Sequence, residues 1–202
     1  MKIAVYCAST PGNDPRFREA AIELGQWIGK SGHSLVYGGS SVGIMGVIAR
    51  EVMAAGGCAY GVEPRFFIEA GVAQEELTEL YVVETMAERK ALMIELADTF
   101  VALPGGVGTL EEISEIMSCV RLGLDVPECY LLNVNGFYDP LKELLSSMEE
   151  QGFIDKVDLE RYLFPETVAE LCNMVADSQD NPRSCLVTAQ ELLDRKGYEP
   201  AK

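Results

Sequence analysis

The stretch Pro104-Gly105-Gly106-Val107-Gly108-Thr109 constrains the fold of this chain most, because it joins two segments of different hydrophobic period. Residues 98–103 before it form a short apolar run, typical of a buried strand. After it, apolar residues recur at helical spacing to about residue 122. Glycines at such a junction let backbone N–H groups approach a ligand and adopt positive φ. The junction therefore predicts a strand, a tight turn and a helix that begins at the turn.

Short apolar runs alternate with helical segments along most of the chain, which predicts an α/β fold with a doubly wound, mostly parallel sheet and helices on both faces. The expected strands are 2–7, 34–37, 58–62, 80–83, 98–103 and 129–134. The expected helices are 15–30, 44–55, 86–97, the segment from the glycine turn to about 122, 137–150 and 165–177. Residues 64–79 are acidic and expected to be irregular and mobile near the site.

The domain organisation follows from the same pattern. Residues 1–177 are expected to form a single nucleotide-binding domain, because no linker interrupts the alternation. Residues 178–202 form a C-terminal tail that opens with polar turn formers. A short helical stripe, 186–193, is expected to dock loosely or to fray.

The composition argues against several classes of partner. The formal net charge is −16 and the sequence pI is about 4.4, so the surface repels nucleic acid and anionic membranes. No stretch approaches the roughly 20 apolar residues of a membrane span. The six cysteines form no C-x-x-C pair and His33 is the only histidine, so we expect no metal site and reduced thiols. The first apolar run is too short for a signal peptide, and the chain is expected to be cytoplasmic.

A second glycine-rich turn, Gly38–Gly43, also follows a strand-like run. Either turn alone is equally explained by a tight connection that holds no ligand, but two such turns together favour binding. A helix N-terminus carries partial positive charge, which suits a phosphate, and Thr109 can cap the helix or donate its hydroxyl to the anion. Neither turn is the dinucleotide fingerprint or a P-loop. The residues assigned to substrate binding are Ser9, Gly39, Lys90, Gly105, Gly106, Gly108 and Thr109.

Arg89 lies on an apolar helical stripe formed by Met86, Met93 and Leu96. A guanidinium on such a face needs an anionic partner, unless it snorkels at the helix end. Lys90, at the margin of the stripe, is a candidate second cation.

The helix after residue 106 carries three glutamates, which lie on different faces of the helix. Its core face is Ile113, Ile116, Met117 and Val120. Glu111 and Glu115 are expected to point into solvent as ordinary surface charges. Glu112 lies at the edge of the apolar stripe, close to where a phosphate would rest, and is the better candidate for chemistry.

These residues resemble the Lonely Guy family of cytokinin riboside 5′-monophosphate phosphoribohydrolases, long mislabelled as lysine decarboxylases. The resemblance covers residues 2–175 and rests on Arg89-Lys90, Pro-Gly-Gly-x-Gly-Thr-x-x-Glu at 104–112, and the stretches 37–46 and 131–138. It implies a dimeric Rossmann-like enzyme with Arg89 and Glu112 at the reacting ribose. The chain departs from the family pattern at four positions, Ser40, Glu63, Gly71 and Ala87, of which Glu63 replaces an apolar residue and Ala87 a histidine.

The sequence thus predicts an N-glycosidase that hydrolyses a nucleoside 5′-monophosphate, a cytokinin riboside monophosphate or an AMP-like nucleotide, to free base and ribose 5-phosphate. We expect the enzyme to need no cofactor and to form a homodimer. The alternative is a non-catalytic nucleotide-binding or carrier protein of the same fold. A lysine decarboxylase would need a lysine that forms a Schiff base with pyridoxal phosphate, and no lysine here has the surrounding signature.

Overall fold

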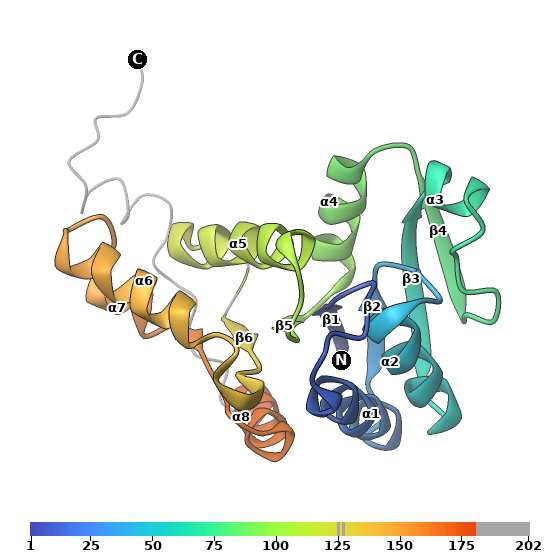
Figure 1. Cartoon of the computed structure of the whole chain (residues 1–202), viewed down its shortest axis with the longest axis horizontal. Coiled ribbons are helices and arrows are strands. Elements are labelled where there is room, and N and C mark those ends of the chain that lie inside the picture. The colour runs from blue at the N-terminus through green and yellow to red at the C-terminus, as the bar shows by residue number, and fades with distance from the viewer. Residues whose placement is uncertain (125, 127, 181–202) are drawn as a thin grey trace.

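The computed structural model of the chain describes residues 1–124, 126 and 128–180, arranged around one sheet (Figure 1). Within these residues the seven strands are parallel, in the order β4-β3-β2-β1-β5-β6-β7. They are β1 (Lys2–Tyr6), β2 (Ser34–Tyr37), β3 (Cys58–Pro64), β4 (Glu79–Val83), β5 (Thr99–Ala102), β6 (Cys129–Leu131) and β7 (Tyr162–Leu163). The helices are α1 (Pro15–Lys30), α2 (Gly43–Ala54), α3 (Arg65–Glu69), α4 (Met86–Leu96), α5 (Val107–Leu122), η1 (Val134–Gly136), α6 (Asp139–Glu150), α7 (Lys156–Leu159) and α8 (Val168–Asp180).

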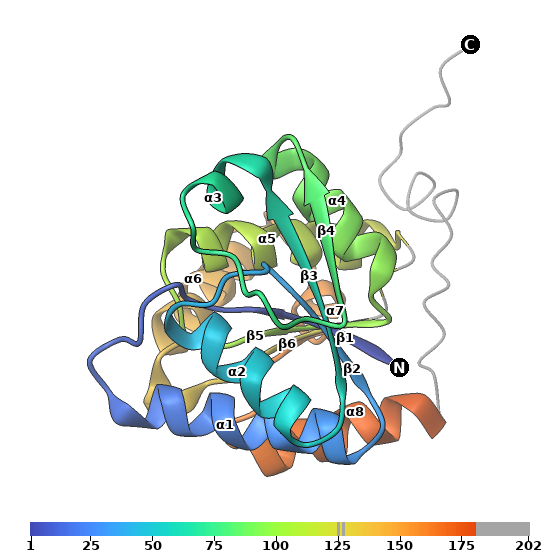
Figure 2. The same cartoon turned by 90° about the vertical axis from the view of Figure 1, so that its right-hand side faces the viewer.

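Helices cover both faces of the sheet, because both faces of its strands are apolar (Figures 1 and 2). In β1, Ile3 and Val5 pack into the core formed with α1, α2 and α8. Ala4 and Tyr6, which alternate with them, face the opposite core, formed with α4, α5 and α6. No helix in the described part of the chain has the length and apolar character needed to cross a membrane.

The predicted fold class is confirmed, and each predicted strand is present. The structure adds β7 and α7, which are too short to show a hydrophobic period in the sequence. The prediction that residues 64–79 are irregular is wrong over Arg65–Glu69, which form α3 directly after β3. This segment is also fastened to the turn after β2, since the carbonyl of Val72 accepts a hydrogen bond from Ser41 N at 2.8 Å. The predicted tail helix near 186–193 lies outside the described residues.

The order in which strands are added to the sheet reverses at β1, and this reversal positions the site. The chain adds β2, β3 and β4 on one side of β1, and then β5, β6 and β7 on the other. The connections after β1 and β5 therefore diverge and leave a crevice at the carboxyl ends of these strands. Ligands of open α/β sheets bind at such a switch point.

Candidate active site

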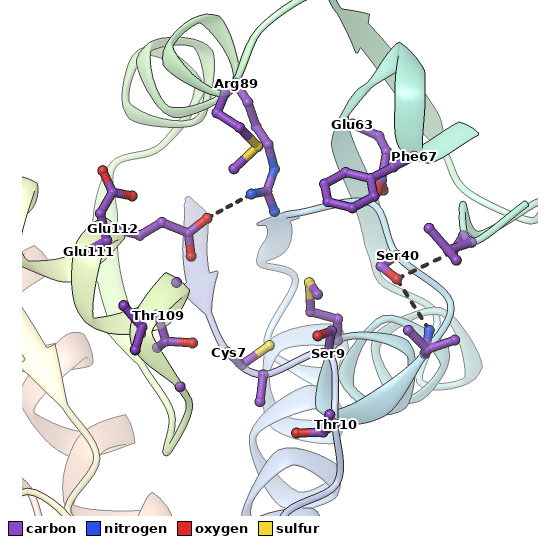
Figure 3. Close-up of a pocket in the computed structure, with 18 of the residues that line it drawn as sticks. Cys7, Ser9, Thr10, Ser40, Glu63, Phe67, Arg89, Thr109, Glu111 and Glu112 are labelled. Carbon is purple, nitrogen blue, oxygen red and sulfur yellow. Dashed lines mark hydrogen bonds and ion pairs between the residues drawn. The ribbon is translucent and has the colours of Figure 1, made fainter. Parts of the chain in front are cut away.

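A cavity of about 700 Å³ opens at the carboxyl ends of β1, β2, β3 and β5 (Figure 3). Its walls come from the loop after β1, the glycine turn after β2, the end of β3 with the segment that follows, the first turn of α4, and the first turns of α5. The volume is within the range of small-molecule sites. Segments far apart in the sequence thus meet around one ligand-sized space.

Arg89 and Glu112 form a buried ion pair in this cavity. Arg89 Nη1 donates a hydrogen bond to Glu112 Oε1 at 2.9 Å, and the two side chains are only 9% and 8% exposed. Arg89 Nε donates to the carbonyl oxygen of Val62, at the end of β3, at 3.0 Å. These two contacts fix the guanidinium between α5 and β3 and exclude the alternative that it snorkels into solvent.

The helix that carries Arg89 is held firmly at its start. Thr85 caps α4 by accepting a hydrogen bond from the backbone N–H of Glu88, while the Glu88 carboxylate accepts one from Thr85 N. Such a capping box stabilises the first turn of a helix. Arg89 lies directly after this turn, so its side chain leaves a well-defined backbone position.

The protonation of Glu112 depends on two opposing effects. Burial raises the pKa of Glu112 above its ordinary value, because the charged form loses hydration, while the neighbouring positive charge of Arg89 lowers it. The ion pair therefore favours the carboxylate in a place where burial alone would favour the neutral acid.

The glycine turn after β5 leaves the N-terminus of α5 open. The N-cap is Gly106, with extended backbone and no side-chain hydrogen bond to the helix. The first N–H groups of a helix without a side-chain cap are available to an anion, and the helix dipole attracts it. Gly106 and Gly108 line the cavity and have open space where a Cβ would be, and the buried Thr109 lines it beside them.

The structure brings most of the sequence-predicted site residues to one cavity. Six of them line it: Ser9, Arg89, Gly106, Gly108, Thr109 and Glu112. Gly39 and Gly105 are not among the lining residues; Gly39 packs against Glu63, and Gly105 packs against Thr109. Lys90 is also outside the lining, and its ammonium forms ion pairs with Glu111 and with Glu115 Oε2, the latter at 3.0 Å.

Two expectations are therefore corrected. Lys90 does not line the cavity as a second cation, and its ammonium pairs with two carboxylates of α5. Glu111 is exposed, as expected, whereas Glu115 is half-buried. Both are partners of Lys90 rather than free surface charges, and Glu111 also borders the cavity.

Sequence reasoning missed the wall that follows β3. Glu63, Phe67 and Val72 all line the cavity, and the sequence singled out Glu63 only as a departure from a family pattern. Its signal was a carboxylate within the apolar end of a strand, Val62-Glu63-Pro64. Glu63 is 2% exposed, and burial raises its pKa to about 7 although the charge of Arg89 opposes the rise.

Metal binding has no support in the described part of the chain. No group of three His, Cys, Asp or Glu side chains is gathered there as a metal ion would require. The five cysteines within it, Cys7, Cys58, Cys119, Cys129 and Cys172, are free thiols.

The fold and the cavity define a class: a Rossmann-like α/β protein with an open helix N-terminus and a buried Arg–Glu pair at the switch point of its sheet. A family model described as "Possible lysine decarboxylase" matches residues 45–175. A cytokinin riboside 5′-monophosphate phosphoribohydrolase from Rhodococcoides fascians is 43% identical over 153 residues, 75% of this chain and 77% of that protein. This chain belongs to the same family, the Lonely Guy (LOG) family.

One further relative agrees with the family assignment, and one solved structure agrees with the fold. The rice protein "Cytokinin riboside 5′-monophosphate phosphoribohydrolase LOG" is 42% identical over 76% of this chain, and the match spans 63% of the rice protein's own length. The solved molybdenum cofactor carrier protein of Chlamydomonas reinhardtii superposes with a TM-score of 0.68 over 89% of this chain and 98% of its own, at 19% identity. At that identity the superposition shows the fold alone.

Proposed function

We propose that this protein hydrolyses the N-glycosidic bond of a nucleoside 5′-monophosphate and releases the free base and ribose 5-phosphate. The observation that carries the proposal is the buried Arg89–Glu112 pair, which faces the same cavity as the open N-terminus of α5. The names of the relatives from rice and Rhodococcoides fascians support it and indicate a cytokinin riboside monophosphate as the substrate. An AMP-like nucleotide is the second candidate substrate.

The phosphate would bind at the start of α5. Backbone N–H groups at Gly106 and Gly108 and the hydroxyl of Thr109 supply donors there, and Ser9 lines the cavity from the loop after β1. Local donors are needed because the net charge of −16 opposes an anion at long range. Binding the phosphate, which does not react, converts binding free energy into orientation of the bond to be cleaved.

Glu112 would act at the ribose. Cleavage of an N-glycosidic bond passes through an oxocarbenium-like transition state, and a fixed carboxylate stabilises the positive charge that develops on the sugar. Glu112 also orients the attacking water and accepts its proton. Arg89 fixes the position of that carboxylate through the 2.9 Å hydrogen bond and favours its ionised form.

Product analysis tests the proposal directly. The purified protein is incubated with AMP, GMP, CMP, UMP and isopentenyladenosine monophosphate, and free base and ribose 5-phosphate are quantified by chromatography. At least one monophosphate should give both products in equal amounts. Binding without turnover across the panel would instead support the alternative, a non-catalytic nucleotide binder or carrier.

A decarboxylase, which the family model's description suggests, fits the cavity poorly. A Schiff base with pyridoxal phosphate needs a lysine amine within the site. None of the described residues that line the cavity is a lysine, and Lys90, the nearest in sequence to Arg89, is held by Glu111 and Glu115. Incubation with lysine should release no carbon dioxide.

We also propose a homodimer, on the evidence of one helix face. Leu110 and Leu122 of α5 are exposed, and the small Ser114 and Ser118 lie between them with hydroxyls bonded back to the helix's own carbonyls. A face of this kind packs readily against another helix. Light scattering on the purified chain checks the mass. A cytoplasmic location with reduced thiols, and a single domain over residues 1–177 followed by a C-terminal tail, 178–202, complete the proposal; the first three residues of that tail continue α8.

A further inference from the structure

Glu63 is a second carboxyl group at the same cavity, on the opposite side of Arg89 from Glu112. It lies at the carboxyl end of β3, next to Val62, whose carbonyl oxygen accepts the hydrogen bond from Arg89 Nε. Figure 3 shows the guanidinium of Arg89 between the side chains of Glu112 and Glu63, with Phe67 beside Glu63. Arg89 thus has a carboxyl group on each side of its guanidinium.

The surroundings of the two carboxyl groups differ. Glu112 accepts a hydrogen bond from Arg89, whereas Glu63 Oε2 is buried and has no hydrogen-bond partner among the residues that the structure describes. Glu63 Oε2 packs directly against Gly39, where a Cβ would lie 2.3 Å from it. A buried carboxylate without a partner is costly, so this environment favours the neutral acid.

A purely structural carboxyl group would have its oxygens satisfied by neighbouring donors. Glu63 instead combines an unsatisfied buried oxygen with a position on the wall of a ligand-sized cavity. A neutral carboxyl group both donates and accepts hydrogen bonds, which the polar edge of a nucleobase can match.

We propose that Glu63, as a neutral carboxylic acid, donates a hydrogen bond and then its proton to a ring nitrogen of the departing base. The inference rests on the proposed function, because it assigns a further catalytic residue to the same hydrolysis.

The sheet order places Glu63 at the base end of the nucleotide. The phosphate turn follows β5, and Glu63 ends β3, three strands away across β1 and β2, roughly 14 Å at ordinary strand spacing. Arg89 and Glu112 lie between these two ends. With the phosphate at α5 and the ribose at the ion pair, the base reaches Glu63 and the apolar surface of Phe67 and Val72.

The step balances without any further reactant. The bond between C1′ and the base nitrogen breaks, its electron pair stays on the base, and Glu63 supplies the proton that neutralises the base. Water forms the new bond to C1′ and gives its proton to Glu112. Glu63 ends as a carboxylate and Glu112 as an acid, and exchange with solvent restores both. A carboxylic acid at the leaving group and a carboxylate at the sugar are the two groups that glycosidases pair.

The leaving group supplies the decisive test. Glu63→Gln, Glu112→Gln and the control Glu95→Gln, on the exposed side of α4, are assayed with AMP and with para-nitrophenyl riboside 5′-phosphate, whose leaving group departs without protonation. Glu63→Gln should lower kcat for AMP on the order of a hundredfold and leave the nitrophenyl substrate nearly unchanged. Glu112→Gln should lower both, and Glu95→Gln neither.

Equal losses on both substrates, or no loss with AMP, would overturn the role of Glu63 while leaving the proposed hydrolysis intact. Wild-type protein that cleaves no monophosphate would overturn both.

The pH profile of the wild type gives a second measurement that needs no variant. The charged or titratable groups around Glu63 are Arg89 of α4 and Tyr37 of β2, and its neighbour in β4 is the apolar Val82. Because the pKa of Glu63 is raised to about 7, kcat for AMP should fall as pH rises above about 7. The rate with the nitrophenyl substrate should not show this limb, and its presence with both substrates would contradict the proposal.

Discussion

Replacing Glu63 by Gln should stabilise the protein at alkaline pH and have little effect at acid pH. The burial of Glu63 raises its pKa from 4.5 to about 7, so the folded protein binds this proton more tightly than the unfolded chain does. Below pH 4.5 the carboxyl group is neutral in both states and costs nothing. Between about pH 4.5 and 7 the unfolded chain has released this proton while the folded protein still holds it, so the wild type loses stability that the glutamine variant keeps, and the loss levels off above about pH 7.

The size of the effect follows from the pKa. Each pKa unit corresponds to about 1.4 kcal/mol, so the rise from 4.5 to about 7 amounts to roughly 3 to 4 kcal/mol at high pH. Part of that loss is already present at pH 5, and roughly 2 to 3 kcal/mol of it should develop between pH 5 and pH 8. Amide and carboxyl groups have nearly the same shape, so packing changes little.

The assay is urea unfolding followed by far-ultraviolet circular dichroism, for wild type, Glu63→Gln and Glu95→Gln at pH 5 and pH 8. The quantity of interest is the variant's free energy of unfolding minus that of the wild type, because groups that titrate equally in both proteins cancel. This difference should grow by roughly 2 to 3 kcal/mol for Glu63→Gln. The difference for Glu95→Gln, on the exposed side of α4, should stay constant. A constant difference for Glu63→Gln as well would show that Glu63 is not desolvated, and would remove the basis for a neutral acid in the cavity.

Three further changes probe the rest of the site. Glu112→Gln should lower kcat by on the order of a hundredfold or more with little change in substrate affinity, since its charge acts in the transition state, and steady-state kinetics that show a loss of affinity alone would contradict this. Gly38→Ala should displace the guanidinium of Arg89, because a Cβ at residue 38 would lie 1.9 Å from Arg89 Nη2. This substitution should lower kcat while the circular dichroism spectrum stays native. AMP should bind at least about tenfold more tightly than adenosine, because charge-assisted hydrogen bonds at α5 are lost with the phosphate, and equal affinities in calorimetry would exclude a phosphate site there.

Much of the fold could be predicted because its signals are local. The junction at residues 104–109 changes hydrophobic period within a few residues, and β5 and α5 follow on either side of it. The elements that were missed, α3, α7 and β7, are two to five residues long and carry no period of their own. They form because neighbouring parts of the chain hold them, as β6 does for β7.

The candidate site was predictable only where one helix carried the information. Arg89 is visible as a cation on an apolar stripe, and helical projection separates Glu112 from Glu111. The partners of Lys90 lie on another helix, α5, and no spacing within α4 reveals them. Glu63 was harder still, because its importance depends on how β2 and β3 lie beside each other and on the missing side chain of Gly39.

The glycines of the first turn have a role that its sequence does not show. Ser40 and Val42 of this turn line the cavity, and its part in ligand binding stays a prediction. Three of its glycines make room for protein groups: Gly38 for the guanidinium of Arg89, Gly39 for the carboxyl group of Glu63, and Gly43 for the backbone of Ser9, whose carbonyl carbon would lie 2.2 Å from a Cβ. Such close approaches require glycine whatever the ligand. The turn after β5 has open space at Gly106 and Gly108, where we propose that the phosphate binds. The glycines of two similar sequences thus differ in what they allow: those of the first turn let charged side chains and backbone approach closely, whereas Gly106 and Gly108 leave space free in the cavity.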